Sequence, residues 1–271
     1  MTFLEDLFDL GGKTAIVAGG AGAIGTVMSK ALLKAGANVV IWSRTRASID
    51  KAIERLKASI NAGERIQGIR IDSGNEKEAA KALQASVAAF GPPEILINAV
   101  GGNIGKAPFV ETDLAQFEEV LKLNLIAGLM VPTKVIGAYW IEEKIKGTII
   151  NLTSMTSYNP LSGVWAYDAA KAGVLNLTQG AANEFARYGI RVNAIAPGFF
   201  LGKQNRTLLV DAKTGEYTER GQAIIAHTPF GRFGETEELI GATLFLASNK
   251  ASGFVTGISI PVDGGYLAYN I

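Results

Sequence analysis

Two residues one helical turn apart are the first candidates for chemistry. Tyr167 and Lys171 close the stretch NLTSMTSYNPLSGVWAYDAAK (151–171), whose second half predicts a helix. Side chains four residues apart share one face of a helix, so the phenol and the ammonium would be neighbours. A free phenol has a pKa of about 10, and a nearby ammonium favours its ionised form. Tyr167 is therefore a candidate general acid/base near neutral pH, although such a pair can equally serve packing alone.

A glycine-rich turn, AGGAGAIG (18–25), lies between a predicted strand and a predicted helix. Glycines in this position let the backbone approach a pyrophosphate, which then sits over the helix N-terminus. The alternative is a tight turn without a ligand, but the strand before and the helix after favour a dinucleotide site. The expected contacts are Gly19, Ala21, Gly22, Ala23, Ile24 and Gly25.

The end of the next predicted strand indicates which dinucleotide is used. A carboxylate there would accept hydrogen bonds from a ribose 2′-hydroxyl, whereas a cation accommodates a 2′-phosphate. The sequence reads Ser43-Arg44-Thr45-Arg46, with no acid before Asp50. NADP(H) is therefore favoured over NAD(H), with Ser43 and Arg44 as contacts, unless the two arginines are simply solvated.

Composition excludes several other classes of protein. The chain has no cysteine and one histidine, His227, which removes disulfide scaffolds, thiol nucleophiles and Cys/His zinc sites. No metal is expected, and no G-x-S-x-G elbow supports a Ser-His-Asp hydrolase. The 26 Lys+Arg nearly balance the 25 Asp+Glu, so neither nucleic acid nor a membrane surface is an expected partner. The N-terminus lacks a basic signal region and no apolar run reaches about 18 residues, which predicts a cytoplasmic protein.

Short β-branched runs alternate with helical patterns along the whole chain. This alternation predicts one doubly wound α/β domain over residues 1–271, with a seven-stranded parallel sheet and helices on both faces. The irregular segment 198–234, near the C-terminus, is interpreted as a substrate lid. The predicted strands cover 14–18, 38–42, 65–71, 94–98, 147–153, 190–196 and 254–262, and the helices cover 24–35, 47–61, 75–90, 112–143, 165–188 and 235–247.

Over essentially its whole length the sequence resembles the short-chain dehydrogenase/reductase family. The resemblance rests on the glycine-rich turn, on Ser154 thirteen residues before Tyr167, and on a series of motifs in the same order: NAVG (98–101), NLIAG (124–128), Tyr167-x-x-x-Lys171, RVNAIAPG (191–198) and PVDGG (261–265). It implies a Rossmann fold and a catalytic tetrad of Asn124, Ser154, Tyr167 and Lys171. The chain departs from the family pattern at Ala18, Ala23 and Gly202, the last replacing a threonine that commonly meets the nicotinamide carboxamide.

The resemblance also implies a mechanism. Hydride passes directly between the nicotinamide and a carbonyl carbon, Tyr167 transfers the proton, and Ser154 polarises the carbonyl oxygen. Lys171 binds the nicotinamide ribose, and Asn124 either supports a water relay to Lys171 or is a buried structural amide. The family's further cofactor contacts map onto Asp72, Ser73, Asn98, Ala99, Val100, Gly101, Pro197, Gly198 and Phe200, besides Tyr167 and Lys171.

The lid and the C-terminal residues resemble a sugar-acid subgroup, the D-mannonate oxidoreductases or fructuronate reductases. The polar run Lys203-Gln204-Asn205-Arg206 suits a hydroxylated carboxylate. The expected substrate contacts are Asn103, Ser154, Tyr167 and Arg206, with Lys106 and Arg232 as rival cations. Two alternatives stay open: a carbonyl reductase of the gluconate 5-dehydrogenase or 3-oxoacyl type, and an inactive NADP-binding sensor or scaffold. The family resemblance also implies a homotetramer.

Overall fold

The computed structural model describes residues 2–60, 62–202, 206–212 and 214–270. Within these ranges the strands form one seven-stranded sheet of order β3-β2-β1-β4-β5-β6-β7, and every neighbouring pair is parallel. The order reverses between β1 and β4, the place where ligands bind in doubly wound folds. The strands are β1 (Thr14–Ala18), β2 (Asn38–Ser43), β3 (Ile66–Arg70), β4 (Pro93–Asn98), β5 (Thr148–Leu152), β6 (Arg191–Pro197) and β7 (Ser259–Val262).

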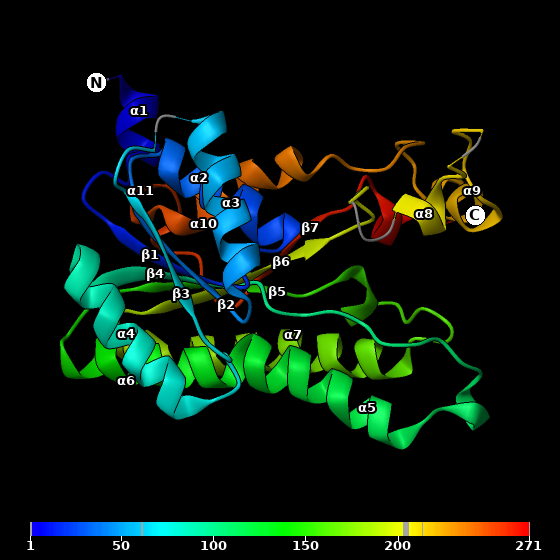
Figure 1. Ribbon diagram of the computed structural model, residues 1–271, viewed down its shortest axis with the longest axis horizontal. Helices are drawn as coiled ribbons and strands as arrows, with labels where there is room; N and C mark the ends of the chain where they lie inside the picture. The colour runs from blue at the N-terminus through cyan, green and yellow to red at the C-terminus, as the bar shows by residue number, and fades with distance from the viewer. Residues whose placement is uncertain (1, 61, 203–205, 213, 271) are drawn as a thin grey trace.

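Helices cover both faces of the sheet and create two apolar cores (Figure 1). On one face pack α2 (Ala23–Lys34), α3 (Arg46–Ser59) and α10 (Ile240–Ala247). On the other lie α4 (Glu76–Phe90), α5 (Leu114–Leu121), α6 (Val131–Glu142) and α7 (Trp165–Phe185). β1, β5 and β6 are buried at every residue, which explains why apolar side chains dominate their sequences.

The expected last strand is shorter than the sequence suggested. Residues 254–258 are not part of β7, because Gly257 adopts a left-handed φ of +78° and interrupts the extended chain. Phe254, at the start of the expected strand, is fully exposed.

The expected helix over 112–143 is composed of α5, a π-helical stretch from Lys122 to Met130, and α6. By length and composition this continuous helix could cross a membrane. However, half of its most apolar stretch is buried inside the protein, as in a core helix.

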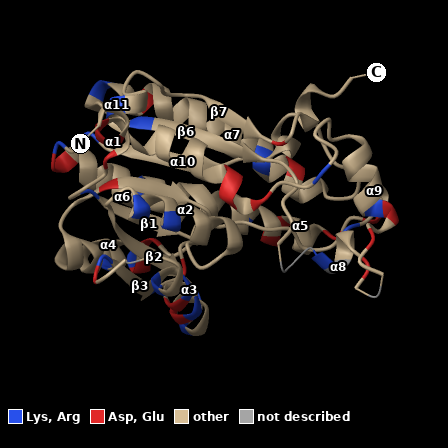
Figure 2. Ribbon diagram, turned by 90° about the horizontal axis from the view of Figure 1, so that it is seen from above, with Lys and Arg blue, Asp and Glu red and all other residues tan. Residues whose placement is uncertain are grey.

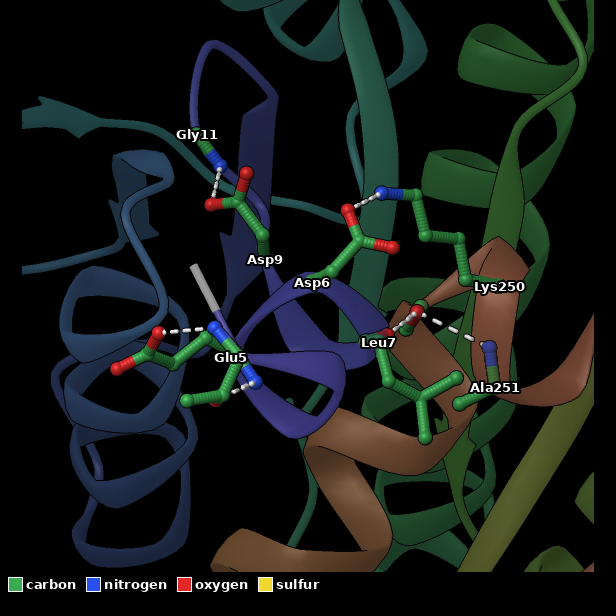
Figure 3. Close-up of polar contacts among 9 residues, drawn as sticks. Glu5, Asp6, Leu7, Asp9, Gly11, Lys250 and Ala251 are labelled. Atoms are coloured by element: carbon green, nitrogen blue, oxygen red, sulfur yellow. Dashed lines mark hydrogen bonds and ion pairs between the residues drawn. The ribbon is translucent and has the colours of Figure 1, made fainter.

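A short N-terminal helix packs against the short helix that follows α10. α1 (Phe3–Phe8) is held against α11 (Asn249–Ser252) by a hydrogen bond of 2.6 Å from Ser248 Oγ to the C=O of Leu7 (Figure 3). An ion pair between Lys250 and Asp6 lies beside it. Neither helix was expected from the sequence, since each is too short to show a periodic pattern.

The segment 198–234, called the lid segment below, contains regular structure in its described residues, where the sequence suggested an irregular stretch. It contains α8 (Arg206–Leu209) and α9 (Glu219–Ala226), and both views place these helices beyond the carboxyl ends of the strands (Figures 1 and 2). One group of its apolar side chains forms a cluster separate from the two sheet cores, whereas the buried Phe200 belongs to the core that also contains α2. The buried members of that cluster are Leu209, Val210, Ile224 and Phe233.

Candidate active site

The predicted catalytic residues come together where β5 meets α7. Ser154 follows the end of β5, and Tyr167 and Lys171 lie one turn apart near the start of α7. The Lys171 ammonium is 5.6 Å from the centre of the Tyr167 ring, and it donates a hydrogen bond of 2.7 Å to the C=O of Leu152. Ser154 and Lys171 are 6% and 5% exposed, so their polar groups lie away from bulk water. The pairing expected from the sequence spacing is present.

Burial has the largest influence on the titration of this group. It raises the pKa of the Tyr167 phenol, and a hydrogen bond with the Ser154 side chain lowers that pKa in part. It also lowers the pKa of Lys171 to about 8, because the charged ammonium loses water. Among the groups of this chain, desolvation of the phenol therefore has a larger effect on the pKa of Tyr167 than the lowering expected from the Lys171 ammonium. A further positive charge beside the phenol would bring its pKa back towards neutrality.

Asn124 is fully buried in the π-helical stretch, and both polar atoms of its side-chain amide make hydrogen bonds. Its Nδ2 donates to the C=O groups of Gly102, at 2.7 Å, and Val120, at 2.8 Å. Its Oδ1 accepts the N–H of Gly102 at 3.1 Å. This reciprocal pair fixes the loop after β4 on the helix. The contacts are those of a structural amide, and the water relay to Lys171 stays a prediction.

Gly101 leaves room for two of the predicted catalytic side chains to meet. A Cβ atom at this position would lie 2.7 Å from Asn124 Oδ1 and 3.2 Å from Lys171 Nζ. Both polar groups therefore border the same glycine. Any side chain here would displace one of them, so the glycine is required by the packing of the site.

The glycine-rich turn is tightly packed at the switch point of the sheet. Gly19 has a left-handed φ of +79°, and a Cβ atom there would lie 2.6 Å from the main chain of Ala99 after β4. A Cβ atom at Gly25 would lie 2.4 Å from the C=O of Gly19. α2 starts directly after Gly22. Every residue of its first turn is described by the structure, and none of them is acidic or caps the N-terminus with a side chain. Its N–H groups and helix dipole thus fit a pyrophosphate.

The two arginines after β2 have different environments. Arg46 opens α3 and pairs with Asp50 at 3.0 Å, so its charge is already compensated. The exposed Arg44 side chain makes no hydrogen bond or ion pair with any residue in the described part of the chain. Arg44 is therefore the cation available to a ligand at the end of β2.

Comparison with known proteins agrees with this geometry. A family model described as "Enoyl-(Acyl carrier protein) reductase" matches residues 19–267. The chain belongs to the short-chain dehydrogenase/reductase family. It is therefore an oxidoreductase that acts on CH–OH groups with a nicotinamide cofactor.

Several relatives of this dehydrogenase/reductase act on sugar acids. The chain is 37% identical to a 2-dehydro-3-deoxy-D-gluconate 5-dehydrogenase of Formosa agariphila, with 97% of this chain and 96% of the relative covered. A Haemophilus influenzae structure with bound NAD, provisionally named a D-mannonate oxidoreductase, has a TM-score of 0.89 and 33% identity, and 98% and 99% of the two chains are covered. A Burkholderia cenocepacia gluconate 5-dehydrogenase in complex with NADP and tartrate has a TM-score of 0.86 and 30% identity, with 98% and 100% covered.

The remaining predicted cofactor contacts of this dehydrogenase/reductase follow the carboxyl ends of the strands. Ser73 is buried after β3, whereas Asp72 is exposed and accepts the N–H of Gly74 at 2.9 Å. The Asn98 amide is buried and donates to Asn151 at 2.9 Å, so the side chain links two strands. Ala99 and Val100 follow β4, and Pro197 is the last residue of β6. Gly198 and Phe200 come directly after that strand.

The predicted substrate side is only partly described. Residues 203–205 lie outside the described residues, and Arg206 is exposed at the start of α8. Arg232 is engaged by Glu238 through hydrogen bonds of 2.6 and 2.8 Å, which weakens its case as a substrate cation. Lys106 lies against Gly163, where a Cβ atom would be 2.7 Å from its Cγ. Asn103 lines a pocket of about 40 Å³ beside the start of α7.

Three features of the site were missed in the sequence. The Ser157 hydroxyl accepts the N–H of Ser154 after β5 and donates to the C=O of Lys171 on α7. Trp165 Nε1 donates to the C=O of Ala107 at 3.0 Å and so fastens the loop after β4 to the start of α7. Asp168 is buried next to Tyr167, and burial raises the pKa of its carboxyl to about 6, partly opposed by the main-chain N–H of Leu161. None of these residues belongs to a recognisable motif, so only the tertiary structure reveals them.

Proposed function

We propose that this dehydrogenase/reductase interconverts a ketone and a secondary alcohol on a sugar acid of the D-fructuronate/D-mannonate type, with NADP(H) as the preferred cofactor. The observation that carries this proposal is the group formed at the end of β5 by the buried Ser154 and Lys171 and the half-buried Tyr167. An intact set of this kind argues against the inactive sensor or scaffold. The sugar-acid relatives argue against a 3-oxoacyl substrate, and a gluconate 5-dehydrogenase is the second candidate.

Each residue of the group has a defined task in this proposal. When bound, the nicotinamide supplies or accepts the hydride. The first turn of α2 and Arg44 hold the phosphates, and Lys171 holds the nicotinamide ribose. Ser154 Oγ donates a hydrogen bond to the substrate oxygen, and Tyr167 delivers or removes the proton of that oxygen. Burial of these groups excludes water and strengthens their electrostatic interactions with the substrate.

A substrate panel with NADPH tests this function. Fructuronate should be reduced with a higher kcat/KM than 5-ketogluconate or a 3-oxoacyl thioester, as measured by the loss of NADPH absorbance. A higher kcat/KM for 5-ketogluconate would favour the second candidate. Failure to oxidise or reduce any sugar acid would refute the proposal.

The cofactor preference is expected to depend on Arg44. The wild-type enzyme should have a lower KM for NADPH than for NADH. Arg44→Asp should raise the KM for NADPH about 10- to 100-fold, because a charge-assisted hydrogen bond contributes about 1.5–3 kcal/mol. Arg46→Ala is the matched control, since Arg46 is already paired with Asp50, and it should change this KM little. A wild-type enzyme with a lower KM for NADH would contradict the assignment.

The enzyme is expected to be a homotetramer. Apolar side chains stay exposed on the π-helical stretch and on α7, among them Ile126, Met130 and Leu177. Phe254 and Ile258 are exposed before β7. Two such faces suit a closed assembly with two-fold axes. Light scattering at micromolar concentration should give about four times the chain mass of 28.6 kDa, and a mass near that of one chain would refute this.

A further inference from the structure

One hydroxyl outside the family's catalytic tetrad joins the two segments that carry it. Ser157 ends a short 3₁₀ turn, Met155–Ser157, that directly follows Ser154. Its Oγ accepts the N–H of Ser154 at 3.3 Å and donates to the C=O of Lys171 at 2.7 Å. The main chain of Ser154 is thereby connected to the main chain of Lys171 through a single side-chain atom.

This connection differs from the other hydrogen bonds between these parts of the chain. The Asn151 amide on β5 donates to Thr178 Oγ1 on α7 at 2.9 Å, further along the helix. The Lys171 ammonium also reaches back to the C=O of Leu152, at 2.7 Å. That contact uses a charged group that the proposed function assigns to the cofactor ribose, and its strength depends on protonation. The Ser157 connection uses only a hydroxyl and main-chain groups, so it contains no group that titrates near neutral pH.

The orientation of the Ser154 hydroxyl depends on the same turn. Ser154 Oγ accepts the N–H of Thr156 at 3.2 Å, which fixes the side chain within the turn. Ser157 closes this turn from the opposite end by taking up the Ser154 N–H. Without the Ser157 hydroxyl, this N–H would have no partner among the residues that the structure describes. Removal of the Ser157 hydroxyl would therefore directly affect the main-chain position of Ser154, a predicted catalytic residue.

We propose that Ser157 is a positioning residue that holds Ser154 Oγ at the correct distance from the Tyr167 phenol on α7. The proposal rests on the proposed function, in which Ser154 and Tyr167 bind the same substrate oxygen. Ser157 itself touches neither substrate nor cofactor. It acts by fixing the separation between the end of β5 and the face of α7 that carries Tyr167 and Lys171. Small errors in this separation reduce the rate, because catalysis requires close alignment of the reacting groups.

The test compares Ser157→Ala with Ser157→Thr, which keeps a hydroxyl. Ser157→Ala should lower kcat about 10- to 100-fold, the scale of a misplacement of about 1 Å. The substrate KM and the Kd for NADPH should change by less than about twofold, because the affected contact is made most strongly in the transition state. Ser157→Thr should restore most of kcat.

Thr243→Val serves as a matched control away from the site. Thr243 Oγ1 is buried in α10 and donates to the C=O of Leu239 at 2.8 Å. Its loss should lower the melting temperature without lowering kcat. An equal loss of kcat in Thr243→Val and Ser157→Ala would show that Ser157 merely stabilises the fold, and an unchanged kcat in Ser157→Ala would also overturn the proposal.

A spectroscopic measurement separates this inference from the choice of substrate. The phenolate absorbance of Tyr167 can be titrated in the NADP⁺ complex, with Tyr167→Phe as the blank. Ser157→Ala should raise the apparent pKa of Tyr167, because a displaced Ser154 no longer stabilises the phenolate through its hydrogen bond. An unshifted pKa would overturn the proposal even if every sugar acid proved inactive. Conversely, a shifted pKa in an enzyme without sugar-acid activity would refute only the proposed substrate.

Discussion

Tyr167→Phe will abolish turnover and leave NADPH binding unchanged. The substitution removes one hydroxyl and keeps the ring that packs beside Lys171, whose ammonium is 5.6 Å from the ring centre. Loss of a general acid/base typically costs about 10²- to 10⁴-fold in rate. The measurements are kcat with the best substrate of the panel and the Kd for NADPH by fluorescence.

Tyr158→Phe provides the control for this experiment. Tyr158 is 41% exposed in the same connection between β5 and α7, and it makes no proposed contact with the substrate. Its variant should keep wild-type kcat and NADPH affinity. If Tyr167→Phe retains more than a few per cent of the wild-type rate, another group supplies the proton and the assignment of Tyr167 is incorrect.

Arg206→Ala is expected to separate sugar acids from neutral sugars. A guanidinium binds a carboxylate through two parallel hydrogen bonds, and Arg206 begins α8 in the lid segment. The KM for the acid should rise by about 10- to 100-fold, which corresponds to about 1.5–3 kcal/mol for a charge-assisted contact. The KM for a neutral ketose should hardly move.

Two further variants make this experiment decisive. Arg220→Ala removes another exposed arginine of the lid segment, on α9, and should leave both KM values unchanged. Lys106→Ala tests the rival cation on the loop after β4. If Lys106→Ala, and not Arg206→Ala, raises the KM for the acid alone, then Lys106 binds the carboxylate. Equal losses of Arg206→Ala on acid and neutral sugar would mean that Arg206 supports the fold of the lid segment.

The architecture could be predicted from the sequence because the central strands of its sheet are buried on both faces. Runs such as TAIVA (14–18) are continuously apolar, and β1 occupies these five residues. The prediction was wrong where one backbone conformation decides the outcome, as at Gly257, whose φ of +78° removes residues 254–258 from β7. The π-helical stretch around Asn124 was also missed, because a hydrophobic period cannot distinguish one extra residue per turn from an ordinary helix.

In the candidate site, too, contacts within one helix could be predicted, whereas contacts between segments remote in sequence could not. Tyr167 and Lys171 could be paired from their spacing alone, because a helix fixes the geometry of residues four apart. Ser157 and Trp165 could not be found, since each contacts a segment that is remote in sequence: Lys171 in one case and Ala107 in the other. Arg44 and not Arg46 was predicted to contact the cofactor, and the ion pair between Arg46 and Asp50 now gives a physical reason to distinguish the two arginines.

The separate apolar cluster of the lid segment has a consequence for how new specificities arise. Leu209, Val210, Ile224 and Phe233 pack with one another rather than into either core of the sheet. Substitutions within this cluster can therefore be accommodated without repacking the two cores of the sheet. Phe200 sets the limit of this independence, because its buried ring belongs to a core of the sheet. A recombinant that exchanges α8 and α9 between homologues is expected to fold, provided that Phe200 is kept.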